Sequence, residues 1–186
     1  MSTPSAGRRG TVECRAKGRR NDQSCGPSMA ASSSLRAIVR GMNPRVQQSL
    51  EEWEPSVGSD ETADPIWQLK CYRVARCLVD HTAGDVVALM STVDPKTISQ
   101  LSRAVGSIGA NLAEGYSRRS AADRSRFYGY ALGSTREATL WYRSVAPFID
   151  RSSLELRMAF LAQERMLLIG MLKSVQRGGG PAFEPG

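Results

Sequence analysis

The stretch from Asp94 to Gly115 constrains the fold of this chain more than any other. Its large apolar residues recur at alternating gaps of three and four, so they all lie on one side of an α-helix. They are Ile98, Leu101, Val105, Ile108 and Leu112. Asp94 can accept a hydrogen bond from a free amide at the helix start, and Pro95 suits the first helical position because it has no N–H. Gly115 is expected to close the helix in the left-handed conformation.

Small residues occupy the positions between these large ones, and two of them are glycines. They are Gly106, Ser107, Gly109, Ala110 and Ala113. A glycine costs about 1 kcal/mol relative to alanine in a helix interior. The small residues therefore predict that another helix comes close to this one.

Three further stretches have helical periodicity. The first begins at Asp64 and Pro65 and is expected to run to about His81. The residues on its apolar face are Trp67, Cys71, Val74 and Leu78. Residues 82–84 are expected to interrupt it, and residues 85–90 either continue the helix or form a short separate turn.

The next helix is expected to begin after Ser120, because Asp123 follows three residues later and the two can form a cap. Its apolar face consists of Phe127, Ala131, Ser134, Ala138, Trp141 and Val145. The helix is expected to end before Pro147. Gly133 and Ser134 again leave room for a neighbour.

The last helix is expected to begin at Asp150 or Ser152 and to end at glycines 178–180. Its apolar face consists of Leu154, Met158, Leu161, Leu168, Leu172 and Val175. Arg165 also falls on this face, where its stem can lie along apolar surface or its head can pair with an acidic residue. Additional apolar residues widen the face, as contact with another subunit would require. They are Phe160, Leu167, Ile169 and Met171.

Four amphipathic segments joined by short loops predict an all-α, antiparallel up-down-up-down four-helix bundle over residues 63–178. Residues 1–62 are rich in Ser, Gly, Arg and Pro and are expected to form a disordered tail. The tail is basic through Arg45 and acidic over residues 51–61. Loose RNA binding and a simple unstructured extension both remain open for it. Residues 179–186 are expected to be a flexible C-terminus.

Composition narrows the classes of function. The net charge of +7 favours a polyanionic partner, although many basic proteins bind none. One histidine excludes a histidine-based triad or a multi-histidine metal site within a single chain. Four cysteines without zinc spacing fit a reduced cytosolic chain, and the apolar runs are too short and too charged to cross a bilayer. We therefore expect a cytoplasmic, non-enzymatic protein that has no catalytic residues, cofactor, metal or membrane partner.

Two blocks of sequence resemble a known family. Residues 100–115, QLSRAVGSIGANLAEG, resemble the pattern Q-L-x-R-A-x-x-S-I-x-x-N-[IL]-A-E-G. Residues 126–137, RFYGYALGSTRE, resemble its second block, an aromatic residue followed by A-x-G-S-x-x-E. The family consists of bacterial four-helix-bundle proteins first noticed as reading frames in intervening sequences of 23S rRNA genes. The resemblance covers about residues 66–175.

This family in turn resembles the accessory variability protein of diversity-generating retroelements. That protein is a pentameric barrel of four-helix bundles that binds the element's reverse transcriptase and its RNA. The resemblance implies a homopentamer here, with RNA or DNA and a reverse transcriptase as partners.

The motif residues have structural roles in our interpretation. Asn111 and Glu114 lie three apart and could be taken for a catalytic or metal pair. We favour hydrogen bonds to the following loop or a neighbouring helix, with Arg103 or Arg118 as partner. The other motif residues are Ser107, Gly115, Gly133, Ser134 and Glu137. The two serines can bond the carbonyl one turn back.

Six arginines are the candidates for binding a polyanion. Arg118, Arg119, Arg124 and Arg126 surround the loop before the third helix, and Arg136 and Arg143 lie on its outer face. The last two are seven residues apart and share a stripe. A pentamer would repeat this stripe into a basic belt suited to an RNA or DNA backbone. An ordinary solvated helix face, with Asp123 and Glu137 in local pairs, is the alternative.

Two functional hypotheses follow from the sequence. The first is an oligomeric bundle that binds nucleic-acid backbone, as an accessory to a reverse transcriptase. The second is a protein-interaction scaffold that binds no nucleic acid, in which apolar patches and the small-residue surface assemble subunits and dock a partner. A small hydrolase that uses Glu114 is a third alternative.

Overall fold

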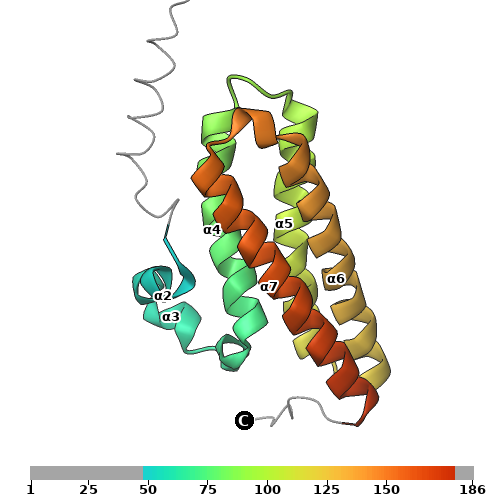
Figure 1. Cartoon of the computed structure of the whole chain (residues 1–186). Helices are drawn as coiled ribbons and strands as arrows, with labels where there is room; N and C mark the ends of the chain where they lie inside the picture. Colours follow the sequence, from blue (N-terminus) through green and yellow to red (C-terminus); the bar gives the residue numbers. More distant parts are fainter. Residues whose placement is uncertain (1–47, 179–186) are drawn as a thin grey trace, which may run out of the picture.

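The computed structural model describes residues 48–178 (Figure 1). This part of the chain contains six α-helices and no strand. The expected all-α class is therefore confirmed over these residues. The expected C-terminal segment and residues 1–47 of the expected tail lie outside the described residues.

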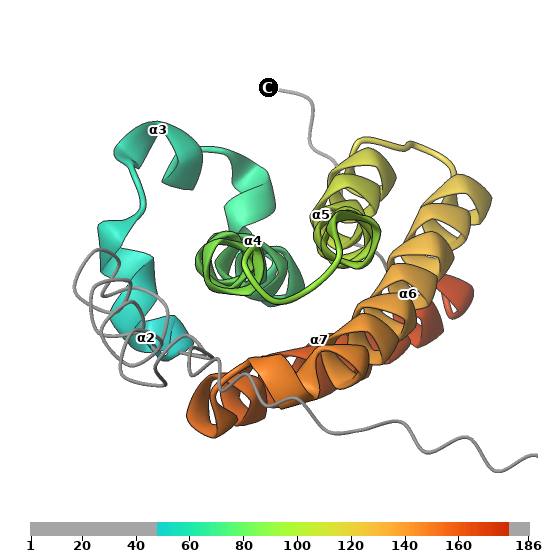
Figure 2. The same cartoon turned by 90° about the horizontal axis from the view of Figure 1, so that it is seen from above.

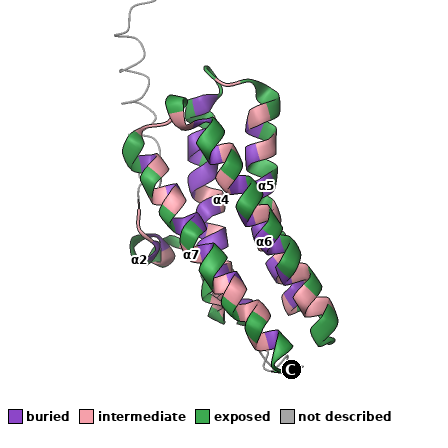
Figure 3. Cartoon of the chain, turned by 45° about the vertical axis from the view of Figure 1, so that its right-hand side comes forward, coloured by how far each residue is buried: buried purple, intermediate pink, exposed green. Residues whose placement is uncertain are grey.

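Four long helices make up most of the described chain (Figure 1). They are α4 (Lys70–Leu89), α5 (Pro95–Tyr116), α6 (Ala121–Ser144) and α7 (Arg151–Gln176). Helix α5 packs on α6, α6 packs on α7, and α4 contacts both α5 and α7. The four helices therefore enclose one shared core, and Figure 3 shows their buried residues facing inward and their exposed residues outward.

The predicted caps lie at the starts of three helices. Asp94 accepts hydrogen bonds from two first-turn amides of α5, and Ser120 and Asp150 each accept one from α6 and α7, all at 3.0 Å. Asp150, and not Ser152, is the cap of α7. Each cap provides a partner for an amide that the helix itself leaves unpaired.

Helix α4 differs from the prediction at both ends. Asp64 caps the short 3₁₀-helix η3 (Pro65–Gln68), and α4 itself begins at Lys70. The expected interruption at residues 82–84 is wrong, because the helix continues to Leu89. Thr82 is buried there, so tertiary contacts stabilise helix where the local sequence favours a break.

A buried ion pair connects α4 to α7. The Arg157 guanidinium donates from Nε to Asp85 Oδ2 at 2.9 Å and from Nη2 to Oδ1 at 3.0 Å. The exposed fractions of these side chains are 0% and 2%. The Tyr142 hydroxyl of α6 donates to the same carboxylate at 2.8 Å and shares a hydrogen bond with Thr82 at 2.7 Å. One polar network thus joins three of the four long helices.

The predicted apolar face of α7 is partly wrong. Arg165 is exposed, and its neighbour Glu164 takes the buried position instead. The reason is that Arg157 turns inward to reach Asp85, which rotates the buried face by about one residue. The four residues expected to widen the apolar face of α7 are covered by this chain. Phe160 is buried, and Leu167, Ile169 and Met171 are half-buried against the same core. Most of the apolar width of α7 is therefore used within this chain.

The predicted face of α6 is also shifted. Ala131, Ala138 and Val145 are buried as predicted, whereas Phe127, Ser134 and Trp141 are only half-buried. The buried residues that the prediction missed are Tyr128, Leu132, Thr135 and Tyr142. Helix α6 packs on both α5 and α7, so its buried face is wider than a single seam.

Part of the expected disordered tail is folded. Residues 48–62 include α2 (Leu50–Trp53), the 3₁₀-helix η2 (Glu54–Ser56) and α3 (Ser59–Thr62), so the expectation of disorder is wrong there. Viewed from above, α2 and α3 lie beside α4 on the side away from α6 (Figure 2). Trp53 is fully buried, and its indole donates to Asp80 at 3.1 Å. One tryptophan anchors a segment whose average composition resembles a disordered chain.

Gly115 does not have the role that the sequence suggested. Helix α5 continues to Tyr116, and among the described glycines only Gly178, after α7, has a positive φ, of 79°. A Cβ on Gly115 would lie 2.6 Å from Cε1 of the buried Tyr128. Glycine at this position therefore lets α6 pack directly on the α5 backbone.

We expect Gly115→Ala to lower the free energy of unfolding by about 1–3 kcal/mol, because the new methyl group overlaps a buried ring. Gly106→Ala is the matched control on the same helix. Apart from its chain neighbours and the backbone of its own helix, no described atom lies within 4 Å of its Cβ position, so stability should rise by up to about 1 kcal/mol. Urea denaturation of both variants tests this, and equal stabilities would contradict the packing argument.

His81 and Glu164 are among the titratable side chains that lie inside the core with 0% exposure. Burial raises the pKa of Glu164 well above its usual value, and its carboxyl oxygens have no hydrogen-bond partner among the described residues. Burial and the nearby charge of Arg157 lower the pKa of His81 to about 3. Both side chains are therefore neutral in the folded protein at neutral pH.

These pKa shifts determine how stability depends on pH. The unfolded chain protonates His81 below its usual pKa of 6.5, whereas the folded chain does so only near 3, so stability falls as the pH drops below 6.5. The unfolded chain releases the Glu164 proton above 4.5, whereas the folded chain keeps it, so stability falls as the pH rises above 4.5. Between pH 4.5 and pH 6.5 the two side chains change the free energy of unfolding by equal and opposite amounts, so their effects cancel.

We expect Glu164→Gln to exceed the wild type in free energy of unfolding above pH 4.5, since the effect of His81 is the same in both proteins. The difference should grow by about 1.4 kcal/mol per pH unit, because glutamine has no proton to lose on unfolding. Near pH 4.5 the two proteins should differ little. Urea titrations across this range provide the measurement, and parallel pH profiles of the two proteins would show that Glu164 is ionised in the fold.

Candidate nucleic-acid interface

The loop between α5 and α6 brings four of the six candidate arginines together. Arg124 donates from Nη1 to the carbonyls of Arg118 and Arg119, at 3.2 and 2.8 Å. This side chain therefore fixes the loop against the first turn of α6. Arg119 itself is exposed, and its side chain has no ion pair within the described part of the chain.

Two arginines of this cluster lie over Phe127. The guanidinium carbons of Arg118 and Arg126 are each 5.2 Å from the centroid of its ring, within the range of cation–π attraction. Phe127 in turn meets Tyr130 at a ring separation of 5.9 Å and an interplanar angle of 89°. The start of α6 thus presents an aromatic pair beside the positive charge of the loop.

Local acidic residues balance part of this charge. Glu114 forms an ion pair with Arg118, and Asp123 forms one with Arg126 at 3.1 Å. All four side chains are about half exposed, and ion pairs at such positions contribute little to stability. A phosphate group can therefore compete for these arginines at small cost to the fold.

Arg136 and Arg143 lie further along α6, and both are exposed. Neither has an ion pair with any of the described residues. Glu137, the acidic residue nearest in sequence, accepts a hydrogen bond from the Trp141 indole at 3.3 Å instead. Arg136 begins about 15 Å along the helix from Arg126, at 1.5 Å per residue. The structure therefore separates the candidates into a loop cluster and an α6 stripe.

The motif residues of α5 make local contacts. Asn111 donates to the Ser107 carbonyl at 2.7 Å within its own helix, and does not reach the loop or another helix. Glu114 does reach the following loop, through Arg118. Arg103, the other expected partner, is exposed and bonds within α5.

Residues 68–147 match the model of the 23S rRNA-intervening sequence protein family. The match confirms, for this part of the chain, the resemblance seen in the two sequence blocks. It runs from the end of η3 to just past α6, and so includes both blocks and all six candidate arginines. That family is consistent with a non-enzymatic helical protein. No curated protein matches the chain.

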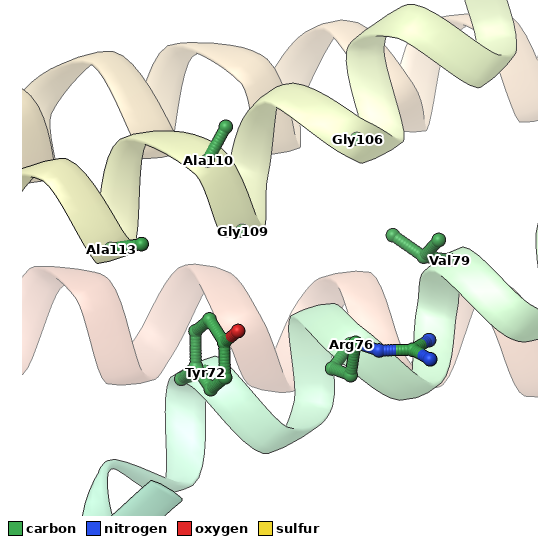
Figure 4. A pocket seen from close by; sticks show the side chains of 7 residues that line it. All are labelled: Tyr72, Arg76, Val79, Gly106, Gly109, Ala110 and Ala113. Carbon is green, nitrogen blue, oxygen red and sulfur yellow. The ribbon is translucent and has the colours of Figure 1, made fainter. Parts of the chain in front are cut away.

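All of the small residues of α5 except Ser107 lie beside α4 in the family-matched region (Figure 4). They line a shallow groove of about 210 Å³. Its lining residues are Tyr72, Arg76 and Val79 from α4 and Gly106, Gly109, Ala110 and Ala113 from α5. A Cβ on Gly109 would meet Ala75 at 3.9 Å, so α4 does approach here. A Cβ on Gly106, by contrast, would meet no atom of α4 within 4 Å.

Residues 48–178 contain neither a cluster of metal-ligating side chains nor a membrane-spanning helix. No three His, Cys, Asp or Glu side chains are grouped so that they could hold a metal ion. No helix there has the length and apolar character needed to cross a membrane.

Arg124→Ala should loosen the loop without unfolding the bundle. Losing its hydrogen bonds to two carbonyls should speed amide hydrogen exchange at residues 117–120 about tenfold, the equivalent of about 1.4 kcal/mol. Arg119→Ala is the matched control and should leave these rates unchanged, because its side chain makes no such contact. Similar rates in both variants would show that Arg124 does not fix the loop.

Proposed function

We propose that this chain forms an antiparallel four-helix bundle that self-associates, has no enzymatic activity and binds the backbone of RNA or DNA. The observation that supports it is the exposure of Arg136 and Arg143 on α6, without acidic partners in the described part of the chain. The resemblance to retroelement accessory proteins supports a homopentamer as the assembly and a reverse transcriptase as the protein partner.

The chemistry of the site favours phosphate. A guanidinium group keeps its charge at every accessible pH and donates paired hydrogen bonds to phosphate oxygens. Arg118 in the loop is followed along α6 by Arg126 and then by the two stripe arginines, as contacts to a continuous backbone require. A ring of subunits would repeat these contacts, and each phosphate contact would add to the salt dependence of binding.

A protein-interaction scaffold is the second candidate, and the α4/α5 groove favours it. Gly106 costs about 1 kcal/mol of helix stability, yet no described atom fills the space beside it. Another protein backbone could use that space. Under this alternative, changing the stripe arginines would leave partner binding intact.

The double variant Arg136→Glu/Arg143→Glu tests the main proposal. Fluorescence anisotropy with a labelled RNA hairpin should show affinity at least tenfold below the wild type. The slope of log affinity against log salt should fall by about 1.4–1.8, because two phosphate contacts are lost.

The control is Arg151→Glu/Arg165→Glu, which changes the net charge equally through exposed arginines of α7. It should retain most of the affinity. If the control loses as much as the stripe variant, only net charge matters and the stripe is not the site. If the wild type does not bind RNA or DNA at low salt, the proposed function is wrong.

A further inference from the structure

The surface of α6 next to the loop has an exposed aromatic ring. Tyr130 is 54% exposed, more than any other aromatic side chain of the described residues. It has one aromatic neighbour, Phe127, whose ring meets it at 89°. A single exposed ring is common on protein surfaces, but this one lies next to Phe127, over which two arginines are placed.

The residues one turn further along α6 leave this ring uncovered. Side chains on a helix lean toward its N-terminus, so residues 133 and 134 would lean over Tyr130. They are glycine and serine. Apart from its chain neighbours and the backbone of its own helix, no described atom lies within 4 Å of a Cβ placed on Gly133, so this glycine has no packing role within the described chain. The C-terminal flank of the Tyr130 ring is therefore bare.

Positive charge lies over the neighbouring ring, Phe127. The guanidinium carbons of Arg118 and Arg126 lie 5.2 Å from the Phe127 centroid, on the aromatic pair that includes Tyr130. Aromatic rings beside guanidinium groups bind single-stranded nucleic acid, because bases stack on the rings and phosphates contact the charges. We call Tyr130, Phe127, Arg118, Arg126 and Gly133 the stacking platform.

We propose that the stacking platform binds an unpaired base of single-stranded nucleic acid, with the base on the Tyr130 ring and the adjoining phosphates on Arg118 and Arg126. This inference rests on the proposed function and makes it more specific, because it names unpaired strands as the substrate class. In a duplex the base faces are already stacked on one another, and a ring on a straight helix cannot reach them. A duplex would meet only the arginines.

The test compares Tyr130→Leu with Tyr130→Trp. Leucine keeps an apolar side chain at an exposed position but removes the flat ring, whereas tryptophan keeps a ring. The probes are a labelled 20-nucleotide single strand and a duplex of the same sequence, measured by anisotropy at low salt. Tyr130→Leu should weaken single-strand binding about tenfold and change duplex binding less than twofold. Tyr130→Trp should retain single-strand affinity.

Two further variants separate stacking from general effects. Leu140→Ser removes another exposed apolar side chain of α6, 61% exposed, and should leave both affinities unchanged. Gly133→Leu adds a side chain that leans over the ring, and should weaken single-strand binding while the duplex affinity is kept. Circular dichroism confirms that each variant is folded.

The outcomes distinguish this inference from the proposed function. Equal single-strand affinities for Tyr130→Leu and the wild type would overturn the platform while leaving backbone binding intact. Equal losses for both probes would overturn the preference for unpaired strands. No binding of either probe by the wild type would overturn both proposals. A Tyr130→Leu variant that binds both probes normally but no longer self-associates in light scattering would identify the surface as a protein contact instead.

Discussion

The arrangement of the helices depends on the buried ion pair between Asp85 and Arg157. A charged pair in the core is stable only when its geometry is good and its remaining hydrogen-bonding groups find partners. The Asp85 carboxylate has such partners, because it accepts two hydrogen bonds from Arg157 and one from the Tyr142 hydroxyl. Because Tyr142 must point inward to reach it, the rotation of α6 is set. Gly133, nine residues earlier, is turned by about 180° and lies at the centre of the outer face, between Tyr130 and Arg136.

Glu164, the other buried acidic side chain of the described chain, avoids an unpaired charge in the core by staying protonated, whereas Asp85 does so by pairing with Arg157. Glu164 lacks a partner among the described residues, so burial keeps it protonated and its pKa high. A neutral carboxyl without hydrogen bonds still loses its contacts with water, which lowers the stability of the fold. Burial likewise raises the thiol pKa of Cys71 to about 12. Self-association adds stability by mass action, which would offset this weakness in the proposed assembly.

The sequence predicted those features that local interactions decide. Caps such as Asp94 and Ser120 act within one turn, and periodicity alone identified the helical stretches. The face of α7 was misplaced because a pattern rule puts charged residues outside, whereas Arg157 is held inside by a residue 72 positions away. Trp53 was missed because composition averages over a segment and hides one anchor. The contact of Arg118 with Phe127 depends on the path of the loop, which no spacing rule gives.

The two unpartnered surfaces differ in charge, and this difference suits them to different partners. On α6 the stripe arginines lie beside the open glycine, so a two-fold contact through this face would bring like charges of two copies together. In the α4/α5 groove, Arg76 is already paired with Glu61 and Asp80, so another chain would meet an electrically balanced, largely apolar surface. A subunit contact through the groove would leave α6 exposed on every copy. Self-association and nucleic-acid binding can therefore occur together without competing for one surface.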